Sequence, residues 1–514
     1  MPLSVEEINE NLPKEIISMV EKRFYHASCE FGKLKKHLAA MQKKRGFVCP
    51  WANKLSEDAW VRKVRKQWAE CVPGRANARG NPGYGFVSLL KIWTYASWFH
   101  AEQNTEEIAS TLEKSEAYAQ LCDLDKEPKK QPQVAKPTAR TLRHFNQIMY
   151  TFALWGDLSR LIVLHNLEQG TFEWSEELII DPTHFDGFAG VNRSCEACKI
   201  CPRRSRCRLK QSTCDVTGIV SKSKNFKLPG VKVNLAVLPK SELAISAIAC
   251  RGQAGDKKLL RPLLLKVAED FPTLRERVEK ILADGIYDDP DCHKDASQIM
   301  EAQLETPINP RARKAKPSTA RGIRKIAPDG VPICAAGHEM ALSGRDLQRQ
   351  QFIWVCPVFS AQHGNANLHC SQTCRKHCAP DAEFGRVLRV SRQLTPQINW
   401  DNPQHASRVA RRYCKRTCVE RAISRCKRIL KFERFFNRGR RSLQAHGDRY
   451  VIAVQLVALV AHLLNRPEAT RCYRLTAYKA VPKIQQTSRQ ILSKSQARKS
   501  SLHCCNPVLS RYPT

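Results

Sequence analysis

The sequence predicts an α/β fold in which a mixed five-stranded sheet is flanked by helices. Three β-rich runs between residues 176 and 250 precede a helix, a fourth strand, a second helix and a short fifth strand. Two acids mark this order, because Asp181 lies inside the first strand and Asp284 closes the fourth. A carboxylate within an apolar strand is costly unless it binds a partner. We therefore expect a binding site at these acids, with a structural salt bridge at Asp181 as the alternative.

Each element of this region follows from a local pattern. Residues 231–238 alternate as a strand does, and residues 257–271 have the amphipathic period of a helix. The expected elements are, in order, a β-rich run over 176–187 that ends in a turn, strands over 231–238 and 242–250, a helix over 257–271, a strand over 278–287, a helix over 291–303 and a strand over 305–310. Three further acids lie beyond strand ends, where turn chemistry explains them: Asp186, Asp288 and Asp289.

The N-terminal third is predicted to consist of helices and a linker. Residues 1–85 form a basic segment that ends in a Gly/Pro-rich linker, and residues 86–165 are predicted to form a helical domain, which is a candidate for DNA binding. The last helix of that domain begins after an N-cap at Thr138. A helix-turn-helix arrangement would bring Arg140 and Arg143 near DNA, although helical bundles with such faces are common.

The composition points to a polyanionic partner. The 514 residues include 85 Lys and Arg against 49 Asp and Glu, which gives a formal net charge of +36. Nucleic acid is the default partner of so basic a chain, and a basic surface kept for solubility is the alternative. The longest apolar run, over 450–464, is too short to span a bilayer. No signal peptide is evident, so we expect a cytoplasmic, nucleoid-associated protein.

The 22 cysteines are expected as free thiols or metal ligands rather than as a disulfide framework. The first candidate zinc group lies between strands one and two and comprises Cys195, Cys198, Cys201 and Cys207, with Cys214 to spare. The second candidate group lies in an insertion over 311–405 and comprises Cys356, Cys370, Cys374 and Cys378. Unligated thiols are the alternative at both places.

A polar stripe on a later helix supplies a third acid. Residues 413–427 contain no Pro or Gly and are predicted to be helical. At about 100° per residue, four side chains fall within an arc of roughly 60°. They are Tyr413, Arg416, Glu420 and Lys427. Arg421 and other arginines surround the carboxylate, which is therefore either a salt-bridged surface residue or a metal ligand beside a phosphate.

The Y-x2-R-x3-E-x6-K spacing of this stripe resembles the signature of a group of bacterial insertion-sequence transposases of the DDE, RNase H-like superfamily. Residues 283–287 resemble the second-Asp motif of that family, although the Gly lies one place early. The resemblance covers roughly residues 86–465. It implies an RNase H-like catalytic core made of residues 176–310 and the helices of 406–465. The remaining residues, 466–514, are expected to form a basic tail.

The resemblance also implies roles for individual residues. The catalytic ligands of two Mg²⁺ or Mn²⁺ ions would be Asp181, Asp284 and Glu420. The DNA-binding residues would be Tyr413, Arg416, Lys427, Arg421, Arg140 and Arg143. In the family, the stripe grips phosphates next to the cut and a displaced base.

We therefore expect a cut-and-paste DNA transposase that acts as a homodimer or a larger assembly on paired insertion-sequence ends. Two other classes remain open. One is an RNase H-like nuclease that cuts without joining, which a strand-transfer assay would distinguish. The other is a non-catalytic, zinc-containing DNA-binding protein derived from a transposase, which would not cleave DNA with Mg²⁺ or Mn²⁺.

Overall fold

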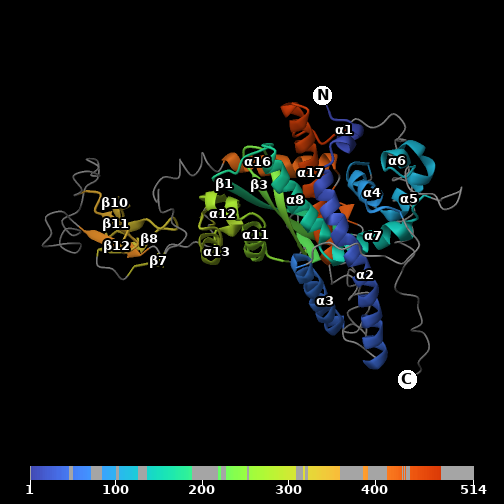
Figure 1. Cartoon of the computed structure of the whole chain (residues 1–514). Helices are drawn as coiled ribbons and strands as arrows, with labels where there is room; N and C mark the ends of the chain where they lie inside the picture. Colours follow the sequence, from blue (N-terminus) through green and yellow to red (C-terminus); the bar gives the residue numbers. More distant parts are fainter. Residues whose placement is uncertain are drawn as a thin grey trace, which may run out of the picture.

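A mixed sheet forms the centre of the computed structural model, and the acidic strand β1 (Glu177–Gly187) lies inside it (Figure 1). β1 pairs antiparallel with β3 (Lys227–Leu238) on one side and parallel with β5 (Lys280–Leu282) on the other. β5 pairs parallel with β6 (Gln303–Glu305). The structure describes residues 2–45, 50–70, 84–99, 104–125, 136–187, 218–221, 227–251, 254–307, 309, 316–318, 322–358, 386–391, 414–430, 432, 434–435 and 440–475.

Three more strands join this sheet. β4 (Leu243–Arg251) and β2 (Gly218–Ser221) both pair antiparallel with β3, and β13 (Arg434–Phe435) pairs parallel with the end of β1. The sequence did not predict β2 and β13, because such short segments show little alternation. The fifth expected strand, over 305–310, was placed too late, since β6 ends at residue 305. A mixed sheet with flanking helices is consistent with an α/β, RNase H-like fold.

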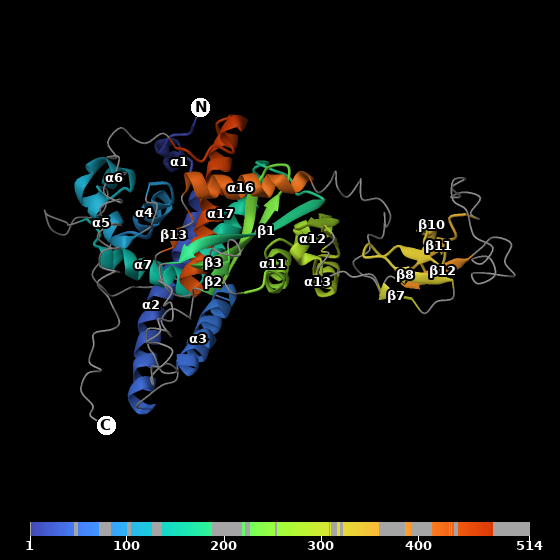
Figure 2. The ribbon, with the colours of Figure 1, turned by 180° about the vertical axis from the view of Figure 1, so that it is seen from behind.

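Helices cover this sheet. α11 (Lys257–Asp270) packs against β3 and β4, and it also contacts α12 (Pro272–Arg277) and α13 (Pro290–Met300). α17 (Arg440–Leu463) packs against β4, where Gly447 permits close approach, because a Cβ there would lie 3.3 Å from Cβ of Ala247. In Figure 2, which views the molecule from the side opposite to Figure 1, α17 lies behind the sheet.

The apolar run over 450–464 covers the C-terminal part of α17. All residues from Ser442 to Ala461 except Gln444 are buried. Burial on every side explains why this helix lacks an amphipathic pattern. Within the described residues, the structure contains no helix with the length and hydropathy needed to span a membrane.

The N-terminal third is helical wherever the structure describes it. Its helices are α1 (Val5–Glu10), α2 (Lys14–Arg45), α3 (Pro50–Glu70), α4 (Phe86–Phe99), α5 (Thr105–Lys114), α6 (Glu116–Leu121), α7 (Ala139–Thr151) and α8 (Leu154–Glu168). Thr138 caps α7, as predicted, by accepting a hydrogen bond from the N–H of Thr141. The buried ring of Phe24 lies 5.0 Å from that of Phe86 and 4.9 Å from that of Phe145, which joins α2 to α4 and α7.

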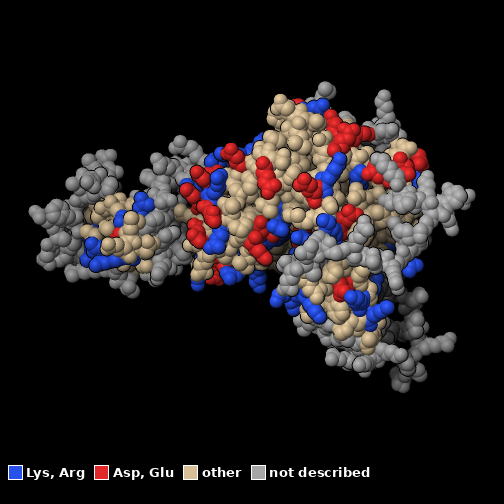
Figure 3. Space-filling view, viewed as in Figure 1, with Lys and Arg blue, Asp and Glu red and all other residues tan. Residues whose placement is uncertain are grey.

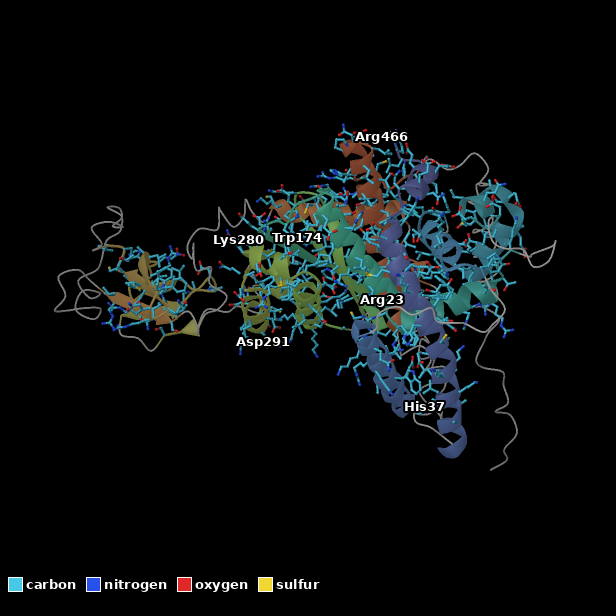
Figure 4. All side chains as sticks on the ribbon, in the orientation of Figure 1. Arg23, His37, Trp174, Lys280, Asp291 and Arg466 are labelled. Atoms are coloured by element: carbon cyan, nitrogen blue, oxygen red, sulfur yellow. The ribbon has the colours of Figure 1, made fainter. Side chains whose placement is uncertain are left out.

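α2 and α3 extend away from the body as a two-helix arm (Figure 1). At its base, Asp157 of α8 accepts hydrogen bonds from Arg65 at 2.8 and 3.1 Å and from Arg23 at 3.4 Å. Farther out, the His37 and Trp60 rings lie 5.3 Å apart and connect the two helices. Figure 4 shows Arg23 close to the body and His37 toward the far end.

The insertion before α16 folds around a small core of its own. Two three-stranded sheets contain β7 (Lys316–Pro317), β8 (Ile323–Ile326), β9 (Pro332–Cys334), β10 (Ala341–Asp346), β11 (Gln351–Val355) and β12 (Val387–Ser391). Phe352 and Trp354 of β11 are fully buried and pack with Met340. β7 and the start of β8 lie in the basic first part of this insertion.

Candidate catalytic site

Asp181 reaches the site from β1, the strand that lies between β3 and β5. The three residues before it are fully buried, and its own side chain is only 13% exposed. Burial is the main cause that raises the pKa of Asp181 to about 7. Arg416 opposes this rise in pKa, whereas Asp284 and Glu420 contribute to it. The Asp181 carboxyl group therefore needs a nearby cation to stay ionised.

Asp284 directly follows β5 and caps a short 3-10 helix, Gly285–Tyr287. Its side chain accepts a hydrogen bond from the N–H of Gly285 at 2.6 Å, and it is half exposed. The strand expected over 278–287 is therefore wrong in its second half. A Cβ at position 285 would lie 3.3 Å from the carbonyl oxygen of Pro307, so the close approach of this loop explains the early Gly.

Glu420 lies in the first turn of α16 (Thr417–Ile429), which crosses the edge of the sheet (Figure 2). The expected helix begins later than predicted, because Cys414–Arg416 form a 3-10 turn. α16 buries Val419 and Ala422 and leaves the Glu420 side chain 57% exposed. The helix thus presents its carboxylate beside β1.

The guanidinium of Arg416 lies among all three acids. Its Nη1 donates a hydrogen bond to Glu420 Oε1 at 2.8 Å, and its Nη2 lies 3.4 Å from Asp181 Oδ1. The same Nη2 lies 4.0 Å from Asp284 Oδ2. The side chain of Arg416 is 13% exposed. Three carboxylates, each more than a hundred residues from the next in the sequence, therefore share one positive charge.

The donor chemistry of this site fits a hard divalent cation. Carboxylate oxygens are the ligands that Mg²⁺ and Mn²⁺ prefer, and all three candidate residues carry a carboxylate. In the described residues, however, no cluster of three or more His, Cys, Asp or Glu side chains has the arrangement needed to hold a metal ion. Asp181, Asp284 and Glu420 are arranged around Arg416 instead.

An open groove runs from the acids along β1 and α16. It has a volume of about 410 Å³. Its lining residues are Asp181, Pro182, Thr183, His184, Glu420, Ile423, Ser424, Lys427 and Arg428. The lining therefore combines two acids with two cations and an imidazole, and Lys427 lies about two helical turns beyond Glu420 on α16, which suits a phosphate chain that passes beside the acids.

The opposite side of α16 is fixed by an acid that the sequence reasoning missed. Glu242 is buried at the β3–β4 turn and has φ 57°, in the left-handed region. It accepts a hydrogen bond from Arg421 Nε at 3.0 Å and one from Arg425 Nη2 at 2.6 Å, and Arg471 approaches at 3.4 Å. The pKa of Glu242 is lowered by these arginines against the effect of burial. Arg421, expected at DNA, thus has a protein partner.

The remaining candidate residues are distributed as follows. Arg140 is exposed on α7, and Arg143 pairs at the surface with Glu106 at 3.0 Å. Cys356 is buried next to β11. Tyr413 lies outside the described residues, as do the other proposed zinc ligands: Cys195, Cys198, Cys201, Cys207, Cys370, Cys374 and Cys378. Their roles stay predictions.

Two of the three rival acids have structural roles. Asp289 caps α13 by accepting a hydrogen bond from the N–H of Asp291, and it pairs with Lys257 at 2.6 Å. Asp288 is fully buried and accepts a hydrogen bond from the N–H of Asn309 at 2.8 Å. Both contacts fit the interpretation that these acids serve the turn.

Residues 212–456 match the family model of the transposase DDE domain. The matched segment contains Asp284 and Glu420, whereas Asp181 lies before its start. Comparisons with curated proteins and with solved structures gave no match. The family match supports a DDE transposase of the insertion-sequence kind.

Proposed function

We propose that this protein is a DNA transposase that cuts phosphodiester bonds at insertion-sequence ends and joins the freed ends to target DNA. The observation that carries the proposal is the meeting of Asp181, Asp284 and Glu420 at one guanidinium. They come from a strand, a loop after a strand and a separate helix. Carboxylates that repel one another are brought together at a cost, which a cation-dependent reaction justifies.

In this proposal the three acids hold divalent ions beside the scissile phosphate. Such ions, when bound, activate the attacking oxygen and stabilise the leaving oxygen. Asp181 is the least exposed of the three and would hold the ions at the buried end of the site. Asp284 and Glu420 are about half exposed and would hold them from the solvent side. Water would attack first, and the freed 3′-hydroxyl would then attack target DNA. The reaction requires no covalent enzyme intermediate.

In this proposal the groove holds the DNA strand through contacts with its phosphates. Lys427 and Arg428 line the groove about two helical turns beyond Glu420 on α16, and each cation would contact a phosphate. Arg416 would contact the phosphate nearest to the acids, since its planar fork suits a phosphate. Tyr413 would act beside it, as the family resemblance implies. The net charge of +36 favours such contacts, and Figure 3 shows Lys and Arg side chains on the surface of the described residues.

The direct test uses purified protein with DNA fragments taken from both flanks of its coding region. With Mg²⁺ or Mn²⁺ we expect nicked ends and products in which those ends are joined to a target duplex. Because paired ends must be held together, joined products should require an assembly of two or more chains. Cut products without joining would favour the nuclease, and uncut DNA with both ions would favour a DNA-binding protein without catalysis.

A further inference from the structure

We propose that Arg416 is an internal counter-ion that keeps divalent ions out of the site until DNA draws it away. The inference rests on the proposed function and concerns the regulation of the same site. Arg416 occupies the position that three carboxylates face. Metal loading would then depend on DNA, so that the DNA-free enzyme is kept from cutting.

The geometry gives Arg416 a contact with every acid. Nη1 serves Glu420 at 2.8 Å, while Nη2 is divided between Asp181 at 3.4 Å and Asp284 at 4.0 Å. A guanidinium that neutralises only one surface acid would not need to lie 13% exposed among three. Its charge therefore serves the group as a whole.

The contacts of Arg416 with the three acids also differ in quality, and this makes displacement feasible. Among these three contacts, the one with Glu420 is the shortest, and Glu420 itself is 57% exposed. Exposed ion pairs contribute little to stability, because water screens them. A phosphate offers the same guanidinium a bidentate partner with two parallel hydrogen bonds. DNA in the groove would thus compete well for Arg416.

The groove brings a phosphate to the correct place. Lys427 and Arg428 line it about two helical turns along α16 from Glu420, so a strand that is held by these two cations would pass beside the acids. When Arg416 turns to that strand, the three carboxylates lose their shared cation. Divalent ions would then bind where the negative charge is left uncompensated.

The absence of a metal-type cluster in the described residues agrees with this account. The three acids are close enough to share Arg416, yet they do not converge as metal ligands while it lies among them. A purely structural salt bridge explains the same contacts, and it makes the opposite prediction. If Arg416 only holds the acids in place, its removal should weaken metal binding.

The experiment measures Mn²⁺ binding to the full-length protein by electron paramagnetic resonance of the free ion. Without DNA, we expect Arg416→Ala to bind Mn²⁺ between about ten- and a hundredfold more tightly than the wild type, because a competing charge-assisted contact is removed. Arg416→Lys, which retains the charge without the planar fork, should fall between them. Arg428→Ala removes the same charge from the same groove and should change the affinity less than about threefold.

A second arm repeats the Mn²⁺ measurement at low ionic strength with a short DNA duplex of mixed sequence. The Mn²⁺ bound in the sample with Asp181→Asn measures the ions that bind to DNA alone, and it is subtracted from the other samples. DNA should tighten Mn²⁺ binding to the wild type by a similar factor and should change binding to Arg416→Ala little. If Arg416→Ala matches Arg428→Ala, or binds Mn²⁺ more weakly than the wild type, the counter-ion role is overturned while the metal site stands. If the wild type and the Arg416 variants bind no more Mn²⁺ than Asp181→Asn does, the protein has no metal site at Asp181. The metal site and the proposed function then fail together.

Discussion

Glu242 Oε2, at the turn between β3 and β4, lies 2.6 Å from Arg425 Nη2 on α16. The pair connects the sheet to the helix that carries Glu420. With Arg421 as a second donor, it limits how α16 can rotate or slide along the sheet. Glu242 is therefore a positioning residue, which acts on the site through α16 without touching the three acids.

Replacement of Glu242 by Gln should weaken both stability and catalysis. Loss of the carboxylate leaves Arg421 and Arg425 without their shared charge, so the free energy of unfolding should fall by about 1–3 kcal/mol. Thermal unfolding measures this change. The kcat of DNA cleavage should fall by a larger factor than KM rises, because Glu420 shifts whereas the DNA-binding groove remains. Glu269→Gln, at an exposed position of α11, is the matched control and should leave both quantities unchanged.

Asp181→Asn should stabilise the protein while it abolishes cleavage. The amide has the same shape and removes a buried charge that lies close to two other carboxylates. At pH 8 with EDTA we expect the free energy of unfolding to rise by about 1–3 kcal/mol. Glu420→Gln, at a half-exposed position, should change it by less than about 0.5 kcal/mol. A destabilised Asp181→Asn variant would show that Arg416 outweighs burial at this site.

The histidine in the middle of α17 should make the fold sensitive to acid. Burial lowers the pKa of His446 to about 3, and Arg449 adds to this effect. Because the folded pKa lies below the unfolded value of 6.5, the stabilisation is present above pH 6.5 and is lost as pH falls toward 3. Between pH 7 and pH 4, His446→Gln should lose less stability than the wild type by roughly 2–4 kcal/mol. Equal slopes in chemical denaturation would contradict the assignment.

The base of the two-helix arm should depend on Asp157. Asp157→Asn weakens the contacts with Arg65 and Arg23, so the arm should open more often than the rest of the fold. Hydrogen exchange should become faster in α3 and in the first half of α2, with α17 unchanged. Asp125→Asn, at an exposed position, is the control. Uniformly faster exchange would indicate global destabilisation and not a local hinge.

The sequence predicted the order of the central strands, with Asp181 inside the first of them and Asp284 at the end of a later one, and the structure has Asp181 in β1 and Asp284 just after β5. Asp181 was singled out because an acid within an apolar strand is unusual, and Asp284 because it closes a later strand, which pairs parallel with β1 in the structure. In the fold the two strands are direct neighbours, since β1 pairs parallel with β5. The periods of strands and helices were sufficient for this part of the prediction.

Contacts across the fold could not be predicted in the same way. Periodicity placed Arg416 on one helical face with Glu420, but a 3-10 turn before α16 aims its guanidinium at β1 as well. Glu242 gave no pattern, because a lone acid in a short turn has its usual explanation in turn chemistry. Its role follows only from the arginines that α16 brings to it.

The central claim is that Asp181, Asp284 and Glu420 act as one metal-dependent site. The most direct measurement is Mn²⁺-dependent cleavage and joining of flanking DNA by Asp181→Asn, Asp284→Asn and Glu420→Gln. Residues that merely support a metal ligand contribute about 10–100-fold, so each of these changes should reduce the rate by more than about a hundredfold. Unfolding curves confirm that each variant is folded. Near wild-type cleavage by any one of the three would contradict the claim.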